Sequence, residues 1–300
     1  MTLRFLYTAS ALLIGTTHLF GAPDNATASY QSTPRNQAAE VEEDLGVIEP
    51  VAGDAKGAMP QEPQEPRTKF RGNVGVRSDF TSNAKLQGDH SSGDVLFLPN
   101  LEFGMNSKFG PGFAFDIATK VESVFYARYD ERAFIGYSVP MTLEWRPTPH
   151  CPRIYIGAEP YRYDSFDTGD RITQAIGVSA GTDYGYAFNN GNTLAFIGYS
   201  FTQYYSDPTI DNRYSHRPIV GLAHQFKPNL FGQCYYQWQY TDYENAPRHD
   251  SRHVVSASMI YQFNRHLFGN IGASFIDNDS SQRNASYQAV VASLGIAWQF

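Results

Sequence analysis

The sequence predicts an all-β protein, a transmembrane up-and-down antiparallel β-barrel of about 12 strands. Three observations predict it. Aromatic residues make up 15% of the 300 residues, a content typical of β-strands and of the aromatic girdles of membrane barrels. From Phe70 onward, apolar side chains occupy every second position in repeated windows, which is the period of a sheet with one apolar face. The last window ends on the final residue, Phe300.

The bulk composition alone resembles that of a soluble protein. Hydrophobic residues make up 42% of the chain, and the mean hydropathy is −0.40. After the N-terminus there is no apolar run of about 20 residues, so we expect no membrane-spanning helix in the mature chain, and a membrane protein without such helices must be a closed barrel. The net charge of −7 and the absence of clustered Lys and Arg exclude nucleic acid as a partner.

The N-terminal residues have the pattern of a secretory signal. Arg4 precedes a mostly apolar stretch over residues 5–20, and Ala26, Thr27 and Ala28 form a small-x-small cleavage site. We therefore predict a signal peptide at residues 1–28. The alternative is a membrane anchor, but polar residues interrupt the stretch.

Residues 29–68 are rich in Pro, Gln, Glu and Ala and carry few apolar side chains. Such a composition cannot build a hydrophobic core. We predict a disordered periplasmic segment here, and a role in docking peptidoglycan or a partner stays open. The barrel is predicted for residues 69–300.

The alternation is clearest around residues 132–146, where Ile135, Tyr137, Met141, Leu143 and Trp145 share one face. Applied to the whole barrel, it predicts twelve strands with alternating short and long connections. Short turns are typical of the periplasmic side of such barrels and long loops of the outside. The predicted strands are residues 69–79, 94–106, 112–123, 132–146, 153–164, 171–188, 192–205, 215–226, 230–242, 252–263, 267–277 and 286–300.

The last strand carries a predicted membrane-insertion signal. Leu294, Ile296, Trp298 and Phe300 alternate up to the terminal carboxylate, a pattern that resembles the signal read by the barrel-assembly machinery of the bacterial outer membrane. We therefore expect this location, with that machinery and outer-membrane lipid as partners. An even number of strands places both termini in the periplasm. Outward aromatic residues near the strand ends predict two girdles, formed by Trp145, Phe188, Tyr261, Phe263, Trp298 and Phe300 on one side and by Trp238 and Tyr240 on the other.

Residues 240–300 resemble porin-like outer-membrane β-barrel proteins, some of which are associated with exopolysaccharide export. The resemblance lies in the Tyr-x-Asp-Tyr before a loop with Arg248, Asp250 and Arg252, in the Tyr-Gln-Phe before a short turn, in the loop that begins at Asp277, and in the terminal strand. None of these is a catalytic motif. The resemblance implies the fold and the location, and suggests a transport role.

The strand parity places charged side chains on the inner wall, mostly in the first five predicted strands. Charges on an inner wall imply water there. The predicted lumen-lining residues are Arg71, Arg77, Glu102, Asp116, Lys120, Glu122, Glu144 and Glu159.

These residues leave three functions open. The first is a narrow channel for ions or small polar solutes, favoured because the inner faces of the last four predicted strands carry small residues and no large apolar plug. The second is a structural or envelope-assembly barrel whose inner charges form a closed salt-bridge network. Inward tyrosines (Tyr155, Tyr161, Tyr163 and Tyr235) either fill space or form a stacking track for saccharides.

The third function is an outer-membrane lipid hydrolase built on His249, Asp250, Ser251 and His253. A serine nucleophile needs a His within hydrogen-bond reach and a third group to orient it, and residues in a polar loop fit this poorly. We therefore expect no enzyme, no cofactor and no metal site. Cys151 and Cys234 are expected to be free thiols, since the strand map separates them.

Overall fold

The computed structural model describes residues 68–86, 92–148, 151–189 and 191–300. The predicted signal peptide and residues 29–67 of the predicted disordered segment lie outside the described residues. Among the residues that the structure describes, no helix is long and apolar enough to cross a membrane.

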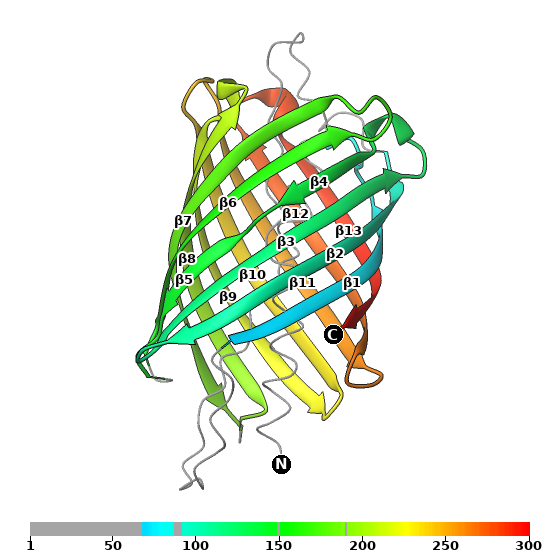
Figure 1. Ribbon diagram of the computed structural model, residues 1–300. Helices are drawn as coiled ribbons and strands as arrows, with labels where there is room; N and C mark the ends of the chain where they lie inside the picture. Colours follow the sequence, from blue (N-terminus) through cyan, green and yellow to red (C-terminus); the bar gives the residue numbers. More distant parts are fainter. Residues whose placement is uncertain (1–67, 87–91, 149–150, 190) are drawn as a thin grey trace, which may run out of the picture.

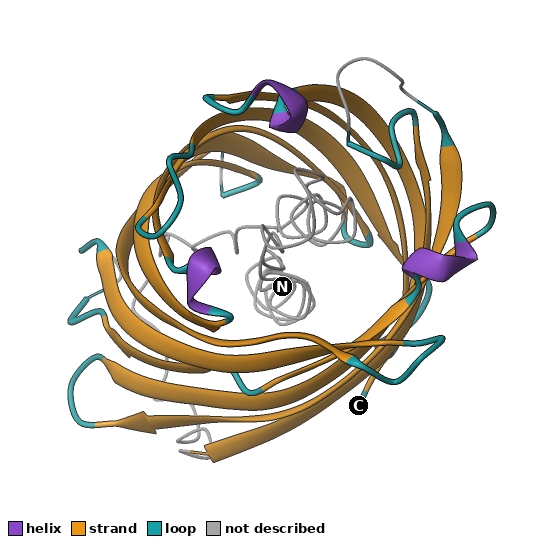
Figure 2. Cartoon of the chain, turned by 90° about the horizontal axis from the view of Figure 1, so that it is seen from above, coloured by secondary structure: helices purple, strands orange, loops and turns teal. Residues whose placement is uncertain are grey.

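The described chain forms one antiparallel sheet that closes on itself, because β1 pairs with both β2 and β13. The strands tilt around the barrel axis (Figure 1) and form a closed ring when seen along it (Figure 2). They are β1 (Thr68–Thr81), β2 (Asp94–Phe109), β3 (Phe113–Tyr126), β4 (Phe134–Ser138), β5 (Met141–Trp145), β6 (Arg153–Ser165), β7 (Arg171–Phe188), β8 (Thr193–Asp207), β9 (Arg213–Lys227), β10 (Leu230–Tyr243), β11 (His249–Gln262), β12 (Leu267–Ser280) and β13 (Tyr287–Gln299).

Strands β4 and β5 are two halves of one predicted strand. Pro140 has no N–H to donate to the ladder, and the regular pairing stops at Val139 and Pro140. Both halves still pair with β3 and β6, and the Val139 amide donates to the carbonyl of Pro160. Counting β4 and β5 as one, the barrel has twelve strands, and the predicted fold class is confirmed.

The two ends of the barrel differ. At the end that we call the short-turn end lie Thr68, Gln299 and the brief connections, such as the one between β9 and β10. At the other end, the long-loop end, three short 3-10 helices lie in the connections: Asp130–Arg132, Thr209–Asp211 and Arg283–Ala285. This alternation of short and long connections is the one predicted from the sequence.

The outer wall is apolar. Phe103, Ile197, Val255, Ile271 and Leu294 are among the exposed hydrophobic side chains that follow the outward parity of the strands. Exposed apolar area of this extent is stable only against lipid. The six predicted aromatic residues of the short-turn end and Trp238 near the other end are exposed, as the two predicted girdles require.

The final residue closes the barrel. The Gly72 amide donates to the Phe300 carbonyl at 2.8 Å, and the Phe300 amide donates to the Gly72 carbonyl at 3.0 Å. Gly72 is needed at this point because a Cβ there would collide with the Phe300 ring. The predicted insertion residues Leu294, Ile296 and Trp298 are exposed on the same outer face.

Substitutions at this seam are expected to lower barrel formation. Gly72→Val drives a branched side chain into the Phe300 ring, and we expect the yield of heat-modifiable folded barrel to fall severalfold. Gly198→Val, within β8 where an added Cβ would come no closer than 3.2 Å to the end of the Ile219 side chain, serves as the control for a β-branched residue in a strand. Equal folding yields of Gly72→Val and wild type, compared by electrophoretic mobility with and without heating, would contradict the closing role of the seam.

Candidate pore lining

The inner wall near the short-turn end carries a network of paired charges on β1, β2 and β3. Arg71 lies at its centre, with Nε donating to Oε1 of Glu102 at 3.1 Å and Nη2 donating to Oδ1 of Asp116 at 2.8 Å. Lys120 Nζ lies 3.6 Å from the other oxygen of Glu102. Four of the eight predicted lining residues therefore come together in one cluster, although up to 49 residues separate them in the sequence.

The cluster forms because small residues leave room for the long arginine side chain. Arg71 pairs across the sheet with Gly104, which in turn pairs with Ala118. A Cβ at Gly104 would lie only 3.0 Å from the guanidinium carbon of Arg71. The glycine thus lets the guanidinium lie over β2 and reach Asp116 on β3.

Glu144 belongs to a second cluster on β5, β6 and β7. Arg153 Nη1 donates to Oε2 of Glu144 at 3.2 Å, and Arg153 Nε donates to Oδ2 of Asp183 at 2.8 Å. The Arg153 side chain also lies over the ring of Tyr155. Only Glu144 of this cluster was predicted from the sequence. Arg153 and Asp183 also occupy inward positions of their strands, so the alternation of inward and outward residues could have identified them.

The three remaining predicted residues extend this lining, and the carboxyl group of Glu122 interacts electrostatically with Arg77 and with Lys120 of the first cluster. Arg77 Nε donates to Asp79 on its own strand at 2.9 Å. Glu122 is hydrogen-bonded to Tyr163 across the sheet. Glu159 is buried. The predicted residues therefore line the inner wall in several groups and do not form one ring.

A third charged group lies on the inner wall near the long-loop end, on later strands for which few inward charges were predicted. Arg213 lies over the rings of Tyr204 and Tyr243. Arg248 also lies over the ring of Tyr243. Arg248 is paired with Asp250, and the two side chains are only 3% and 7% exposed. Inward charge is therefore concentrated in the early strands, as expected, but a second buried set lies near the long-loop end.

These residues were missed because the polar stretch around residue 248 was interpreted as a loop. In the structure β11 starts at His249, with Asp250, Arg252 and Val254 facing inward and His249, Ser251 and His253 facing outward. Inward and outward positions keep alternating through these charged residues. A hydropathy pattern does not show this alternation, because residues on both faces are polar, but counting every second residue does. Arg252 Nη2 donates to Oε1 of Gln239 at 2.7 Å.

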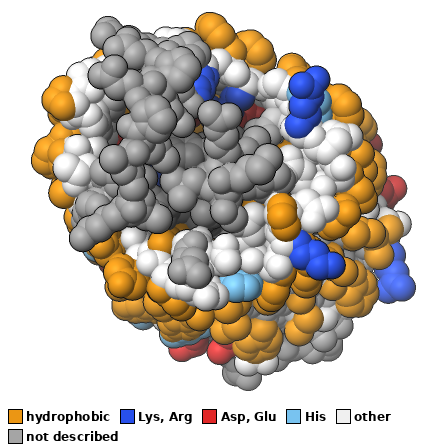
Figure 3. Space-filling view, turned by 90° about the horizontal axis from the view of Figure 1, so that it is seen from below, with side chains coloured by type: hydrophobic (Ala, Val, Ile, Leu, Met, Phe, Trp, Pro, Cys, Tyr) orange, Lys and Arg blue, Asp and Glu red, His pale blue; other side chains and the backbone are white. Residues whose placement is uncertain are grey.

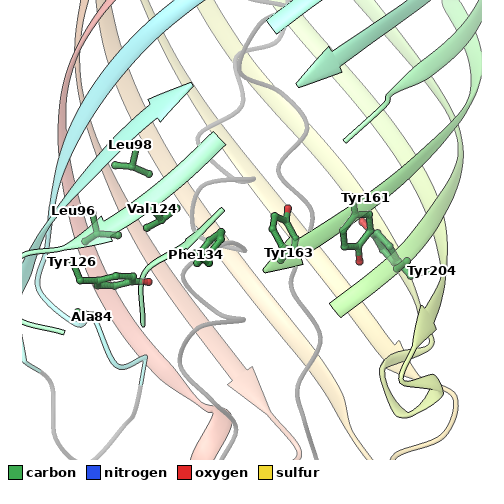
Figure 4. Packing of buried hydrophobic residues seen from close by; sticks show 10 residues of the cluster. Ala84, Leu96, Leu98, Val124, Tyr126, Phe134, Tyr161, Tyr163 and Tyr204 are labelled. Atoms are coloured by element: carbon green, nitrogen blue, oxygen red, sulfur yellow. The ribbon is translucent and has the colours of Figure 1, made fainter. Parts of the chain in front are cut away.

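Apolar side chains also fill part of the inner wall, which corrects a second expectation. One cluster joins β2, β3, β4, β6, β7 and β8, and Figure 4 shows Phe134, Tyr163, Tyr161 and Tyr204 within it. The other cluster contains large inward side chains from the strands that were expected to carry no large apolar plug: Tyr235, Val254, Ile276, Tyr287 and Val291. These strands therefore carry a large apolar cluster on their inner faces, contrary to that expectation.

The connection between β1 and β2 enters these clusters. Ala84 packs in the first cluster and Leu86 in the second, both nearly fully buried. Asn83 Nδ2 donates to the carbonyl of Gln288 at 3.0 Å, and Arg132 Nη1 donates to the carbonyl of Ala84 at 3.4 Å. Residues 82–86 are therefore held against the inner wall near the long-loop end.

The two ends of the inner wall differ in exposure as a result. Three side chains of the short-turn clusters stay partly exposed, with Asp116 at 24%, Glu144 at 30% and Arg153 at 32%, while Glu102 is buried. Near the long-loop end, the inward side chains of Arg252, Val254 and Ile276 are at most 2% exposed. Viewed from the short-turn end, hydrophobic side chains cover much of the circumference and charged side chains appear on the rim (Figure 3).

Asp211 is the one loop carboxylate with a strongly shifted titration among the described residues. It lies in the 3-10 helix between β8 and β9, it is 1% exposed, and neither carboxylate oxygen has a hydrogen-bond partner among the described residues. Burial raises the pKa of this carboxyl from 3.8 to about 8, opposed by the charge of Arg213. At neutral pH the carboxyl is therefore mostly protonated.

The arrangement needed for a serine hydrolase is not formed at the residues considered for it. Ser251 Oγ accepts a hydrogen bond from Trp238 Nε1 at 2.9 Å, and His253 Nδ1 is hydrogen-bonded to Tyr236. Asp250 points to the opposite face of β11 and cannot orient either histidine. Within the described part of the chain, no group of three or more His, Cys, Asp or Glu side chains could hold a metal ion, and both cysteines are free.

Comparison with known proteins agrees with this barrel. Residues 161–300 match the family model described as "Putative beta-barrel porin 2", so the resemblance to porin-like outer-membrane barrels is confirmed and extends beyond residues 240–300. No curated protein matches the sequence.

Solved structures match at low identity and show the fold alone. An outer membrane channel from Pseudomonas putida F1 aligns with a TM-score of 0.51 and 10% identity, over 81% of this chain and 100% of that one. An anion-selective porin from Comamonas acidovorans aligns with a TM-score of 0.41 and 9% identity, over 78% and 99%. The translocator domain of the autotransporter NalP from Neisseria meningitidis aligns with a TM-score of 0.44 and 9% identity, over 79% and 90%.

Proposed function

We propose that this porin-like outer-membrane β-barrel protein is a narrow channel for ions and small polar solutes, with a wide charged vestibule at the short-turn end and a constriction near the long-loop end. The observation that carries the proposal is the graded exposure of the inner wall. Paired charges such as Asp116, Glu144 and Arg153 remain partly exposed, which requires water beside them.

The orientation follows from the connections. We propose that the short-turn end faces the periplasm and the long-loop end the outside, since barrels of this class have short periplasmic turns and longer extracellular loops. Both Thr68 and Gln299 then lie on the periplasmic side. The insertion signal, with Phe300 at the seam, would be read there by the barrel-assembly machinery.

Both signs of charge line the vestibule, so weak selectivity is expected. Arg71, Lys120 and Arg153 form ion pairs with the four carboxylates of Glu102, Asp116, Glu144 and Asp183, so the set carries one net negative charge. A permeating ion therefore meets mostly paired charges, and the choice between cations and anions depends on the more exposed members. Glu144 is the most exposed carboxylate of this set, with a side-chain exposure of 30%, which makes it the best residue to test.

Planar-bilayer recording of the refolded barrel tests the channel. We expect discrete conductance steps, and Glu144→Gln should shift the cation-to-anion permeability ratio toward anions about twofold, because one unit charge in a wet pore contributes on the order of 1 kcal/mol before screening by salt. Glu244→Gln removes a carboxylate from an exposed loop position outside the wall and should leave the ratio unchanged. Equal shifts in both variants would show that net charge, and not the pore lining, sets selectivity.

A structural barrel without conduction is the second candidate, favoured by the dense burial near the long-loop end. The side chain of Leu86 distinguishes the two. In a channel, Leu86→Ser loosens the constriction and should raise the conductance. A barrel that folds with normal heat-modifiability but is silent in both wild type and Leu86→Ser would establish the structural function.

A further inference from the structure

A shallow apolar groove crosses the outer wall of the barrel. It encloses about 1000 Å³, and its surface is almost entirely apolar. Its floor is a row of small outward side chains on four neighbouring strands. Each of these residues is the cross-strand partner of the next one. These floor residues are Cys234, Ala257, Ala273 and Ala292.

Larger side chains border the floor on its short-turn side. Met259, Ile271 and Leu294 face outward there, while Leu222, in register with Cys234, borders the floor on β9. The groove is therefore about one row of side chains wide. It arises where β10 to β13 carry small side chains, and larger apolar side chains border it. On a surface that faces lipid, a groove of this composition fits a hydrocarbon chain and excludes polar ligands.

A second observation lies on the same strands, toward the long-loop end. There the outer wall changes from aliphatic to aromatic and polar side chains that are already hydrogen-bonded to one another. The Tyr236 hydroxyl is 2.7 Å from Nδ1 of His253, and Gln288 Nε2 donates to Oδ1 of Asp277 at 3.2 Å. Trp238 follows Tyr236 on the outer face of β10 and is 37% exposed. We call this surface the aromatic-polar patch.

The patch has the chemistry of a saccharide surface. Exposed aromatic rings such as those of Tyr236 and Trp238 present apolar faces on which the C–H side of a sugar ring packs. Imidazole, amide and carboxylate groups supply donors and acceptors for sugar hydroxyls. Asp277 and Asp279 face outward on β12 at this height, and carboxylates disfavour a phosphate head group by like-charge repulsion.

We propose that the outer wall of β10 to β13 binds a lipid with an uncharged saccharide head, its acyl chain in the groove and its head on the aromatic-polar patch. The two surfaces meet on β10, which carries Cys234, Tyr236 and Trp238 at successive outward positions. On β11 to β13 the exposed side chains of Val255, Phe275 and Val290 lie between the two surfaces, and the lipid packs along them. One amphipathic molecule spans both. The proposal requires that the barrel lies in a membrane, and it does not depend on conduction.

A second copy of the chain fits the same wall less well. Packing through this face by two-fold symmetry would bring Asp277 and Asp279 of the two copies toward one another, which is unfavourable. The polar side chains of the patch would also lose water without gaining defined partners. A lipid with hydroxyl groups satisfies them and leaves the carboxylates hydrated at their edges.

Trp238 provides the readout. The chain has 3 Trp residues, and Trp145→Phe with Trp298→Phe leaves Trp238 as the single fluorophore, next to the proposed head site. The refolded barrel is placed in phosphatidylcholine nanodiscs that contain increasing fractions of monogalactosyl diacylglycerol or, separately, of phosphatidylglycerol. We expect a saturable change in Trp238 emission with the galactolipid and none with the anionic lipid.

Groove-filling variants test the acyl part of the site. Ala257→Phe or Ala273→Phe fills the floor and should raise the half-saturating galactolipid fraction about tenfold. Ala180→Phe, at an exposed outward position of β7 that does not line the groove, should leave it unchanged. Having two variants at different strands, each checked for heat-modifiability, separates loss of binding from loss of folding. His253→Ala should raise the half-saturating fraction without affecting the groove.

Three outcomes would overturn the proposal. An equal response to both lipids, or an unchanged half-saturating fraction in both groove variants, would assign the surface to general lipid contact. A disulfide between the Cys234 side chains of two copies, formed under oxidation with loss of the galactolipid response, would assign the wall to a dimer. A silent barrel in conductance recordings leaves this proposal intact, so the two failures are distinguishable.

Discussion

Replacing Arg71 with alanine is expected to destabilise the barrel and to turn its lumen toward cations. The substitution leaves Glu102, which is 4% exposed, and Asp116 facing each other with only Lys120 to compensate. Removing one partner of a buried pair costs about 3–5 kcal/mol, and the partial hydration of this network reduces the expected loss to about 2–3 kcal/mol. The free energy of unfolding in urea, followed by tryptophan fluorescence, measures the effect.

Two further variants identify its cause. Arg71→Lys keeps the charge but loses the planar fork that reaches both carboxylates, so we expect it to recover only part of the stability. Arg162→Ala breaks an ion pair with Asp164 on the outer face, where Arg162 is 49% exposed, and should be far less destabilising than Arg71→Ala. If Arg71→Ala is no more destabilising than Arg162→Ala, the inner network sets the charge of the pore lining but does not stabilise the barrel.

The second large effect is a pH dependence at Asp211. Because its pKa in the folded protein is about 8, against an ordinary value of 3.8, the folded state binds a proton that the exposed carboxyl has already released. Stability of the closed loop is therefore complete below about pH 4 and falls as the pH rises to about 8. The shift corresponds to at most about 5–6 kcal/mol, and opening of the loop limits the measured effect.

Hydrogen exchange of the connection between β8 and β9 tests this prediction. Corrected for the intrinsic exchange rate at each pH, protection should fall between about pH 4 and about pH 8 in the wild type and stay level at higher pH. In Asp211→Asn, which cannot ionise, it should stay constant. Asp207→Asn is the matched control, since Asp207 is an exposed carboxylate at the end of β8, next to this connection and paired with Arg171, and should behave like the wild type. A flat wild-type profile would contradict the buried, protonated state.

The strands could be predicted because the alternation of apolar and polar residues within each strand shows which side faces lipid. A side chain that faces lipid must be apolar, its neighbour can be polar, and this alternation is local. The prediction failed where a local signal was weak. Pro140 splits one predicted strand into β4 and β5, and the charged residues at the start of β11 carried the alternation without hydropathy contrast.

The candidate lining was only partly predictable for a different reason. Parity fixes which residues face inward, so Arg71, Asp116 and Glu144 were identified. Which of them meet depends on strand register and tilt, which place residues that are 45 positions apart within 2.8 Å. The inward path of residues 82–86 depends on side chains from five or more strands, and no segment of the sequence encodes it alone.

The sequence by itself determined the class of fold, the number of strands and the apolar outer wall, since these follow from a two-residue period and from the absence of water in lipid. Only the tertiary structure decided how the inner wall is divided into a partly exposed charged end and a densely packed end. That division depends on contacts between residues far apart in the chain, such as Leu86 with Val291 in one apolar cluster. Such contacts form only when the sheet closes into a barrel.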